Sequence, residues 1–350
     1  MATATLMQDG DEKALLRQAG AAVEAIDELL QQAIACVRRR VSDDDDLQAS
    51  LLDQEQRAVH GLAWLATYVE SLRQMQAWAE RLHGDGAFGE REQLILKLAF
   101  SEYLARIAGG IPMNQVETVR LCDLGLPLDA GLNHPAVRAM LPKADDRQTR
   151  ARLAELMDDG QFGDWALDDE TLDMIRDQFR RFADEQVAPF AQGWHERDAL
   201  IPDAVVDAVA ELGVFGLTIP EDQGGLGLGK ASMCVVTEEL SRGYIGVGSL
   251  GTRSEIAAEL IRLGGTPEQQ AHYLPKIASG EILPTAVFTE PNTGSDLASL
   301  QTRATLTNGS YQIQGSKTWI THAARADLMT ILCRTQPNEP GYRGLSILLA

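Results

Sequence analysis

The sequence predicts an α+β protein in which two helical regions are followed by a β-sheet region. Apolar residues recur at helical spacing over most of the chain before Leu283, and from there the spacing changes to the two-residue period of strands. Helices and strands are therefore segregated along the chain. This order favours separate helical and β domains over an alternating βαβ sheet.

Composition limits the classes of protein to consider. The 350 residues are 45% hydrophobic and 23% charged, which is typical of a soluble globular protein of about two domains. The formal net charge of −20 argues against nucleic acid as a partner. No apolar run is long enough to span a membrane, and the N-terminus does not resemble a signal peptide. The four cysteines are scattered without a CxxC pair, which predicts reduced thiols and a cytoplasmic location.

The first region, residues 1–160, is expected to be a helical unit that ends in a linker. Helical spacing predicts three helices, over residues 11–40, 47–82 and 92–108. Gly109 and Gly110 predict a left-handed end to the third helix. Three aromatic residues of the second helix are interpreted as bundle core rather than as a cofactor site: Trp64, Tyr68 and Trp78.

The second region, residues 161–282, is expected to be a separate helical domain. Helices are predicted over residues 172–182, 202–212, 231–241 and 246–263, with a short one after Thr266. The glycine-rich loop "IPEDQGGLGLGK" (219–230) follows no predicted strand. Its glycines are therefore expected to supply positive φ angles rather than to bind a dinucleotide.

The third region, residues 283–350, is expected to be a β-domain. Its first strand is predicted at "TAVFT" (285–289), and the turn Asn308-Gly309 predicts a hairpin after it. Two more strands are predicted at residues 327–335 and 343–350.

Two polar loops of the third region are candidate binding elements. "TEPNTGSD" (289–296) offers hydroxyls and a glycine that suit a phosphate or the edge of a polar heterocycle. In "KTWIT" (317–321), we expect Trp319 and Thr321 on one face of a strand, where a flat ring beside a hydroxyl suits a planar cofactor. Two ordinary surface loops would explain this composition about equally well. The sequence contains neither a Walker loop, a metal-binding histidine pair nor a hydrolase nucleophile elbow.

These residues resemble the acyl-CoA dehydrogenase family. "TEPNTGSD" resembles the flavin loop T-E-P-x-x-G-S-D of that family. "GSKTWITHAARADL" (315–328) is similar to its G-x-K-x-W-I-T-N segment, with His322 where Asn is usual. "LGVFGLTIPEDQGGLG" (212–227) and "EELSRGYIGVG" (238–248) resemble two further blocks. The resemblance covers about residues 168 to 350, in order and at the right spacing.

The resemblance implies a fold and a chemistry. The family has an N-terminal helical domain, here residues 161–282, a middle β-domain, here begun at 283–350, and a C-terminal four-helix bundle, with FAD between the last two. The implied reaction is α,β-dehydrogenation of an acyl-CoA, with electrons passed to electron-transferring flavoprotein. The bundle and the glutamate base would follow residue 350. We therefore expect this chain to be a fragment and assign no catalytic residue within it.

The resemblance also assigns binding residues. Those expected at the flavin are Phe288, Thr289, Gly294, Ser295, Trp319, Ile320 and Thr321. Ser295 is also expected at the CoA arm, and Ala286 stands where relatives often place an aromatic residue at the thioester.

Residues 1–160 are an extension of the usual family plan. With "GGIPMNQVETVRLCDLGL" (109–126), this extension resembles the branch that oxidises (2S)-methylsuccinyl-CoA to mesaconyl-CoA. The free carboxylate of a dicarboxylic substrate needs a partner, and Arg253 lies on the helix under the acyl pocket in relatives, so it is a candidate for a bidentate pair. A lone helical Arg is more often a solvated charge.

Alternatives remain open at this point. One is an acyl-CoA oxidase on the same fold, and another is a non-catalytic flavin- or CoA-binding interaction protein. The resemblance also predicts a homo-oligomer. A dimer is favoured over a tetramer if the extension replaces a subunit contact.

Overall fold

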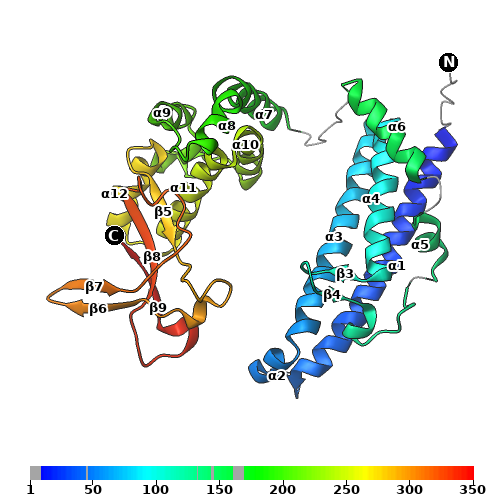
Figure 1. Ribbon diagram of the computed structural model, residues 1–350, viewed down its shortest axis with the longest axis horizontal. Coiled ribbons are helices and arrows are strands. Elements are labelled where there is room, and N and C mark those ends of the chain that lie inside the picture. The colour runs from blue at the N-terminus through cyan, green and yellow to red at the C-terminus, as the bar shows by residue number, and fades with distance from the viewer. Residues whose placement is uncertain (1–8, 45, 132, 143–145, 161–168) are drawn as a thin grey trace. The chain divides into compact units, whose positions relative to one another are not determined.

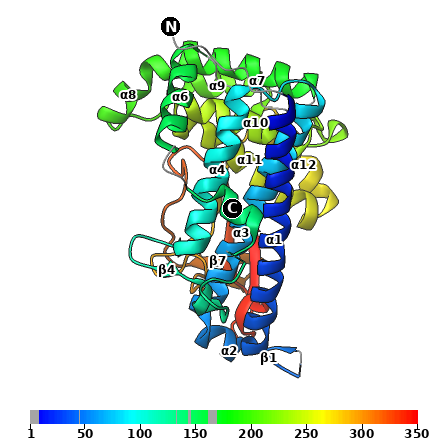
Figure 2. The same cartoon turned by 90° about the vertical axis from the view of Figure 1, so that its right-hand side faces the viewer.

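The computed structural model describes residues 9–44, 46–131, 133–142, 146–160 and 169–350. The chain divides into two compact units, Met1–Ala166 and Leu167–Ala350, which are described one at a time (Figures 1 and 2). Among the helices that the structure describes, none is long and apolar enough to cross a bilayer.

The first unit is built from long helices that pack side by side. Its helices are α1 (Asp9–Val41), α2 (Ala49–Gln54), α3 (Gln56–Gly84), α4 (Glu90–Gly109), α5 (Pro135–Met140) and α6 (Asp146–Asp158). Its short antiparallel strand pairs are β1 (Ser42–Asp43) with β2 (Asp46–Leu47), and β3 (Ile111–Pro112) with β4 (Thr118–Val119). α1 and α4 pack on α3, and their apolar faces form one core.

The predictions for this unit are confirmed with two corrections. Tyr68 is buried, and Trp64 and Trp78 pack against the same core, so the aromatic residues belong to the bundle as predicted. The predicted second helix is broken at Glu55, where φ of −101° and ψ of 20° depart from helical values and separate α2 from α3. Gly110 has a positive φ of 124° but a ψ of 134°, because the chain extends at once into β3. The predicted left-handed helical end is therefore wrong.

The second unit begins with six helices. They are α7 (Glu170–Phe182), α8 (Ala188–Glu196), α9 (Asp203–Glu211), α10 (Lys230–Gly243), α11 (Ile245–Gly264) and α12 (Pro267–Ala278), with a π-helical turn at Ala183–Val187 between α7 and α8. All five predicted helices are confirmed, whereas α8 was not predicted. The side chains of Asp169 and Thr266 cap α7 and α12 by accepting hydrogen bonds from backbone N–H groups of their first turns.

A mixed sheet follows these helices. Its strands are β5 (Pro284–Val287), β6 (Arg303–Thr307), β7 (Ser310–Gln314), β8 (Leu328–Arg334) and β9 (Leu345–Leu349). β8 lies centrally, parallel to β5 and β6 and antiparallel to β9. Asn308 and Gly309 both have positive φ, of 52° and 83°, in the turn of the β6–β7 hairpin, as predicted. α11 packs against β5, so these helices and the sheet share one compact unit.

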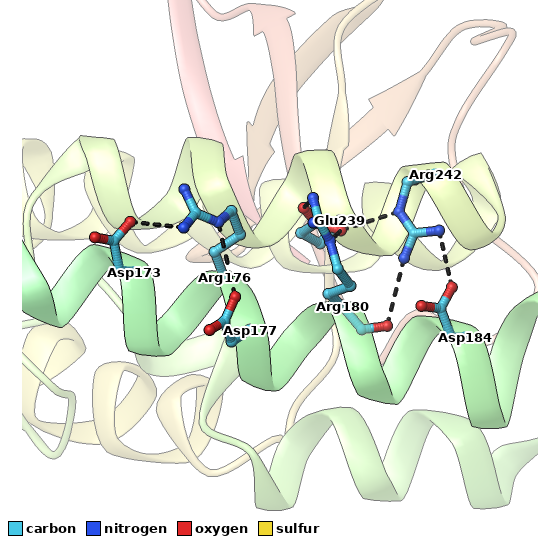
Figure 3. Close-up of polar contacts among 7 residues, drawn as sticks. All are labelled: Asp173, Arg176, Asp177, Arg180, Asp184, Glu239 and Arg242. Atoms are coloured by element: carbon cyan, nitrogen blue, oxygen red, sulfur yellow. Dashed lines mark hydrogen bonds and ion pairs between the residues drawn. The ribbon is translucent and has the colours of Figure 1, made fainter. Parts of the chain in front are cut away.

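A network of ion pairs fixes α7 to α10 (Figure 3). At its centre, the carboxylate of Glu239 is only 2% exposed and accepts two hydrogen bonds from Arg180, at 2.7 and 3.2 Å, and one from Arg242, at 3.0 Å. Arg242 also pairs with Asp184 at 2.8 Å. Burial raises the pKa of Glu239, but the two arginines outweigh this effect and leave its pKa below the usual value. A charge that is buried in this way is stabilised only while its partners are in place.

Candidate functional site

The two candidate loops lie side by side, although 29 residues separate their bonded partners Phe288 and Lys317. The backbone N–H of Thr318 donates to the carbonyl of Thr289 at 3.0 Å. The Thr285 hydroxyl donates to the carbonyl of Thr321 at 2.7 Å. The structure thus brings the end of β5 and residues 317–322 together along their length.

A buried ion pair joins the same two loops. The Lys317 ammonium lies 3.2 Å from the Glu290 carboxylate and also donates to the carbonyl of Phe288 at 2.7 Å. Glu290 accepts two further hydrogen bonds, from the backbone N–H groups of Gln301 and Thr302, each at 2.8 Å. Burial raises the pKa of Glu290, but the side chain of Thr302, the two backbone donors and Lys317, in that order, outweigh it and lower the pKa to about 2. The carboxylate is therefore ionised, and it holds three separate segments in one place.

The prediction for Trp319 and Thr321 needs correction. Residues 315–320 do not form a strand, because Trp319 has a φ of 59° and His322 a φ of 42°, both in the left-handed region. A left-handed residue interrupts the alternation of a strand, so these two side chains do not share a strand face. Trp319 is 88% exposed, so its ring is presented to solvent from a backbone that the bonds to β5 hold in place.

The other residues expected at the flavin fall into two groups. Phe288, Thr289, Ile320 and Thr321 are half-buried at the junction of the loops. Gly294 and Ser295 are exposed beyond a tight turn in which Glu290 and Thr293 exchange backbone hydrogen bonds. Nothing lies within 4 Å of the position that a Cβ of Gly294 would take, so a ligand has room to approach this backbone.

A polar groove of about 450 Å³ adjoins these loops. It is lined by residues 290–293, 301–303 and 314–316, which include the cation Arg303 and the hydroxyls of Thr293 and Ser316. Hydroxyls, a cation and an exposed indole are groups that can bind a planar ring with a phosphate tail. The residues present therefore fit FAD.

The two residues expected at the substrate lie on neighbouring elements. Ala286 is half-buried on β5, and Arg253 is half-buried on α11, the helix that packs against β5. No hydrogen bond or ion pair joins Arg253 to any residue that the structure describes, and its Nε atom is buried.

Three residues that shape the site were not predicted to take part in it. Glu290 and Lys317 lie inside the two loop motifs, but the sequence reasoning considered only hydroxyls, glycines and aromatic rings. An acid and a lysine in two adjacent loops could have signalled the pair. His322 was noted only as a departure from Asn, yet its Nε2 lies 2.9 Å from the carbonyl oxygen of Pro284 on β5.

Comparison with known proteins agrees with this architecture. The family models for the N-terminal and middle domains of acyl-CoA dehydrogenases match residues 169–281 and 285–350. A (2S)-methylsuccinyl-CoA dehydrogenase from Cereibacter sphaeroides is 59% identical over 342 residues, which are 96% of this chain and 62% of that relative. A benzylmalonyl-CoA dehydrogenase from Aromatoleum aromaticum is 38% identical over 161 residues, 46% of this chain and 42% of that protein.

A solved structure shares the fold of the second unit. A glutaryl-coenzyme A dehydrogenase in complex with glutaryl-CoA superposes with a TM-score of 0.50 at 32% identity, over 53% of this chain and 48% of that one. The present chain thus spans less than two thirds of the length of the proteins that it matches. With both family models matched in order and the loops in the arrangement described above, the chain belongs to the acyl-CoA dehydrogenase family.

Proposed function

We propose that this chain supplies the helical and β parts of an FAD-dependent dehydrogenase that converts (2S)-methylsuccinyl-CoA to mesaconyl-CoA. The observation that carries the proposal is the 59% identity to a (2S)-methylsuccinyl-CoA dehydrogenase over 96% of this chain, because that match includes the helical extension as well as the loops. The similarity to a benzylmalonyl-CoA dehydrogenase supports the broader class, a substituted dicarboxylic acyl-CoA.

The residues of the two loops have distinct roles in this proposal. Trp319 and Ile320 would lie near the isoalloxazine ring, and Phe288, Thr289 and Thr321 would line its edge, where the two hydroxyls are able to donate hydrogen bonds. Ser295, together with the open backbone at Gly294, would hold a phosphate of the cofactor or the CoA arm. When it is bound, FAD would accept the hydride that leaves the β-carbon of the substrate.

The same reasoning assigns the acyl end of the substrate. The small Ala286 on β5 leaves room beside the thioester, and Arg253 on α11 pairs with the free carboxylate. The base that removes the α proton would come from a glutamate outside this chain. The two electrons removed from the substrate would pass to electron-transferring flavoprotein.

The test uses the complete gene product, purified with FAD and kept without oxygen. Addition of (2S)-methylsuccinyl-CoA is expected to bleach the flavin absorbance rapidly, and butyryl-CoA or glutaryl-CoA should bleach it more slowly. If another acyl-CoA reduced the flavin and (2S)-methylsuccinyl-CoA did not, the proposed dehydrogenation would stand and the proposed substrate would be wrong. Flavin that no acyl-CoA reduces would overturn the enzymatic proposal in favour of a non-catalytic binding protein.

A second mixing step tests the electron acceptor. The reduced protein is expected to transfer electrons to electron-transferring flavoprotein much faster than to oxygen. Faster reaction with oxygen would indicate an acyl-CoA oxidase instead.

The assembly and location of the protein are further parts of the proposal. The extension, residues 1–160, lies within the compact unit Met1–Ala166, and we propose that it replaces a subunit contact and leaves a dimer. A tetramer measured by light scattering after size exclusion would contradict this idea.

The four cysteines are unpaired, which supports a cytoplasmic location that cell fractionation can test.

A further inference from the structure

A groove runs along α1 where this helix packs beside α3 in the first unit. Its volume is about 590 Å³, and its α1 side is formed by Lys13, Leu16, Arg17, Gly20, Ala21 and Glu24. Leu16 is buried and the two small residues are half-buried, so the floor of the groove is apolar. We call it the α1 groove and take the position between Gly20 and Ala21 as its centre. An apolar groove on a helical surface is a common binding site for another helix.

Charged residues are arranged symmetrically about this centre. Counted from the nearer of the two central residues, Arg17 lies three positions before and Glu24 three positions after. Both side chains are exposed, and neither makes a hydrogen bond or ion pair with any residue that the structure describes. Lys13 and Glu28, seven positions out on each side and also exposed, continue the pattern. Spacings of three and seven residues keep all four side chains on one face of the helix.

An antiparallel copy of the same helix carries the complementary pattern. A two-fold axis at the centre of the α1 groove places Arg17 of one copy opposite Glu24 of the other. The same contact then occurs twice, because a two-fold interface pairs each residue with its partner in both directions. Lys13 and Glu28 meet in the same way. The small central residues allow the two helices to approach to the usual separation of about 8 to 10 Å. The groove is therefore complementary to itself in charge and in shape.

We propose that the α1 groove binds α1 of a second copy of this chain, antiparallel, so that the two extensions of a dimer pair around a two-fold axis. This inference rests on the homodimer proposed above, and it does not depend on the enzymatic activity. A closed two-fold contact uses the same face on both copies and leaves no such face free for a third. It therefore favours a dimer over a larger assembly.

The expected contact is specific but weak by itself. Exposed ion pairs each contribute little, so this surface is not expected to hold two separate chains together alone. In a protein that is already paired through other parts, the contact forms within one assembly, at a high effective concentration. Because symmetry repeats each ion pair, one substitution in the sequence changes the contact at two places.

The first experiment is chemical cross-linking of the complete FAD-loaded protein with Ala21→Cys. The reagent is a bismaleimide that spans about 8 Å, which matches the separation of two packed helices. The unmodified chain, with its exposed Cys122 and Cys234, gives the background. Arg147→Cys is the matched control, because this exposed residue of α6 belongs to the same unit and does not line the groove. Ala21→Cys is expected to form cross-linked pairs at least about tenfold faster than the control.

Charge reversal tests the orientation of the two helices. In the Ala21→Cys protein, Arg17→Glu or Glu24→Arg alone places like charges opposite each other and should slow cross-linking about tenfold. The double variant Arg17→Glu/Glu24→Arg restores opposite charges in the reverse sense and should recover the rate. When the two single variants are produced together with different tags, nearly all cross-linked pairs should be mixed. Charges that play no part would give about half mixed pairs.

Three results would overturn the inference. They are cross-linking of Ala21→Cys no faster than in the control, cross-linking that ignores charge reversal, and a double variant that stays slow. The first result would mean that another part of the protein, or solvent, covers the groove. The comparison of Ala21→Cys with the unmodified chain requires no charge variant to fold. Light scattering keeps the two proposals apart, because a dimer without these cross-links removes this inference and leaves the proposed dimer intact.

Discussion

Replacing Glu290 by Gln is expected to release the two binding loops from each other. The substitution keeps the shape of the side chain but removes the charge that Lys317 and two backbone N–H groups share. Lys317 is only 10% exposed, so it would be left as a buried cation with no carboxylate beside it. A partner lost from such a site costs more than a neutral hydrogen bond.

The size of the effect follows from the pKa of Glu290. The carboxyl has a pKa of about 2 against an ordinary value of 4.5. At roughly 1.4 kcal/mol for each pKa unit, the folded site favours the ionised form by about 3 kcal/mol. The side chain is only 8% exposed, so screening by solvent reduces this figure little.

Hydrogen exchange in the full-length chain is the appropriate assay. The amides of Gln301 and Thr302 donate to Glu290, so they report its loss directly. If local opening governs their exchange, about 3 kcal/mol corresponds to roughly 150-fold faster exchange in Glu290→Gln. Glu281→Gln is the control, because Glu281 is 62% exposed and pairs with Lys276 on the surface. Exposed pairs of this kind contribute at most about 1 kcal/mol.

A double-mutant cycle with Lys317→Met separates the ion pair from the backbone bonds. A coupling free energy of about 1 to 3 kcal/mol between the two sites is expected. Unchanged protection of the two amides in Glu290→Gln would refute the reasoning, because it would mean that the carboxylate does not hold the segments together.

Three further predictions follow from the second unit. In a carbon-13 titration, the carboxyl of Glu290 should stay ionised far below pH 4.5. Because its pKa is lowered in the folded state, its contribution to the free energy of unfolding is complete above pH 4.5 and is lost as the pH falls towards about 2. Glu239→Gln should remove about 3 kcal/mol from the free energy of unfolding, measured by the thermal midpoint, whereas Glu259→Gln at an exposed pair should change it by less than about 1 kcal/mol. Gly225→Ala should lower the midpoint more than Gly229→Ala, because a Cβ at Gly225 would lie 2.1 Å from a backbone oxygen and one at Gly229 meets nothing within 4 Å.

The helices and the hairpin could be predicted from the sequence because their signals are local. Apolar periodicity located α1, α3, α4 and the helices of the second unit, apart from α8. α8 was missed because it follows a π-helical turn that continues directly from α7, so no break in the chain marks its start. Asn308-Gly309 predicted the β6–β7 turn because both positions require positive φ.

The geometry of the site depends on contacts that no local pattern reveals. Glu290 and Lys317 meet only because β5 and the loop after β7 become neighbours in the fold. The strand expected around Trp319 fails for the same reason, since bonds to Thr289 and Thr285 hold this segment and allow a left-handed residue within it. The motifs located the site, and tertiary contacts determined the direction of its side chains.

The two left-handed residues indicate how the candidate site keeps its shape. Trp319 and His322 each adopt a backbone conformation that costs a non-glycine residue about 1 to 2 kcal/mol. Such conformations persist only where the surroundings over-determine them. Here the ion pair of Glu290 and the bonds to Thr285 and Pro284 supply that constraint from the side away from solvent. The backbone that carries the exposed indole is therefore held in place without a ligand, and if Trp319 binds the proposed cofactor, the affinity should depend on these buried contacts as much as on the groups that touch the ligand.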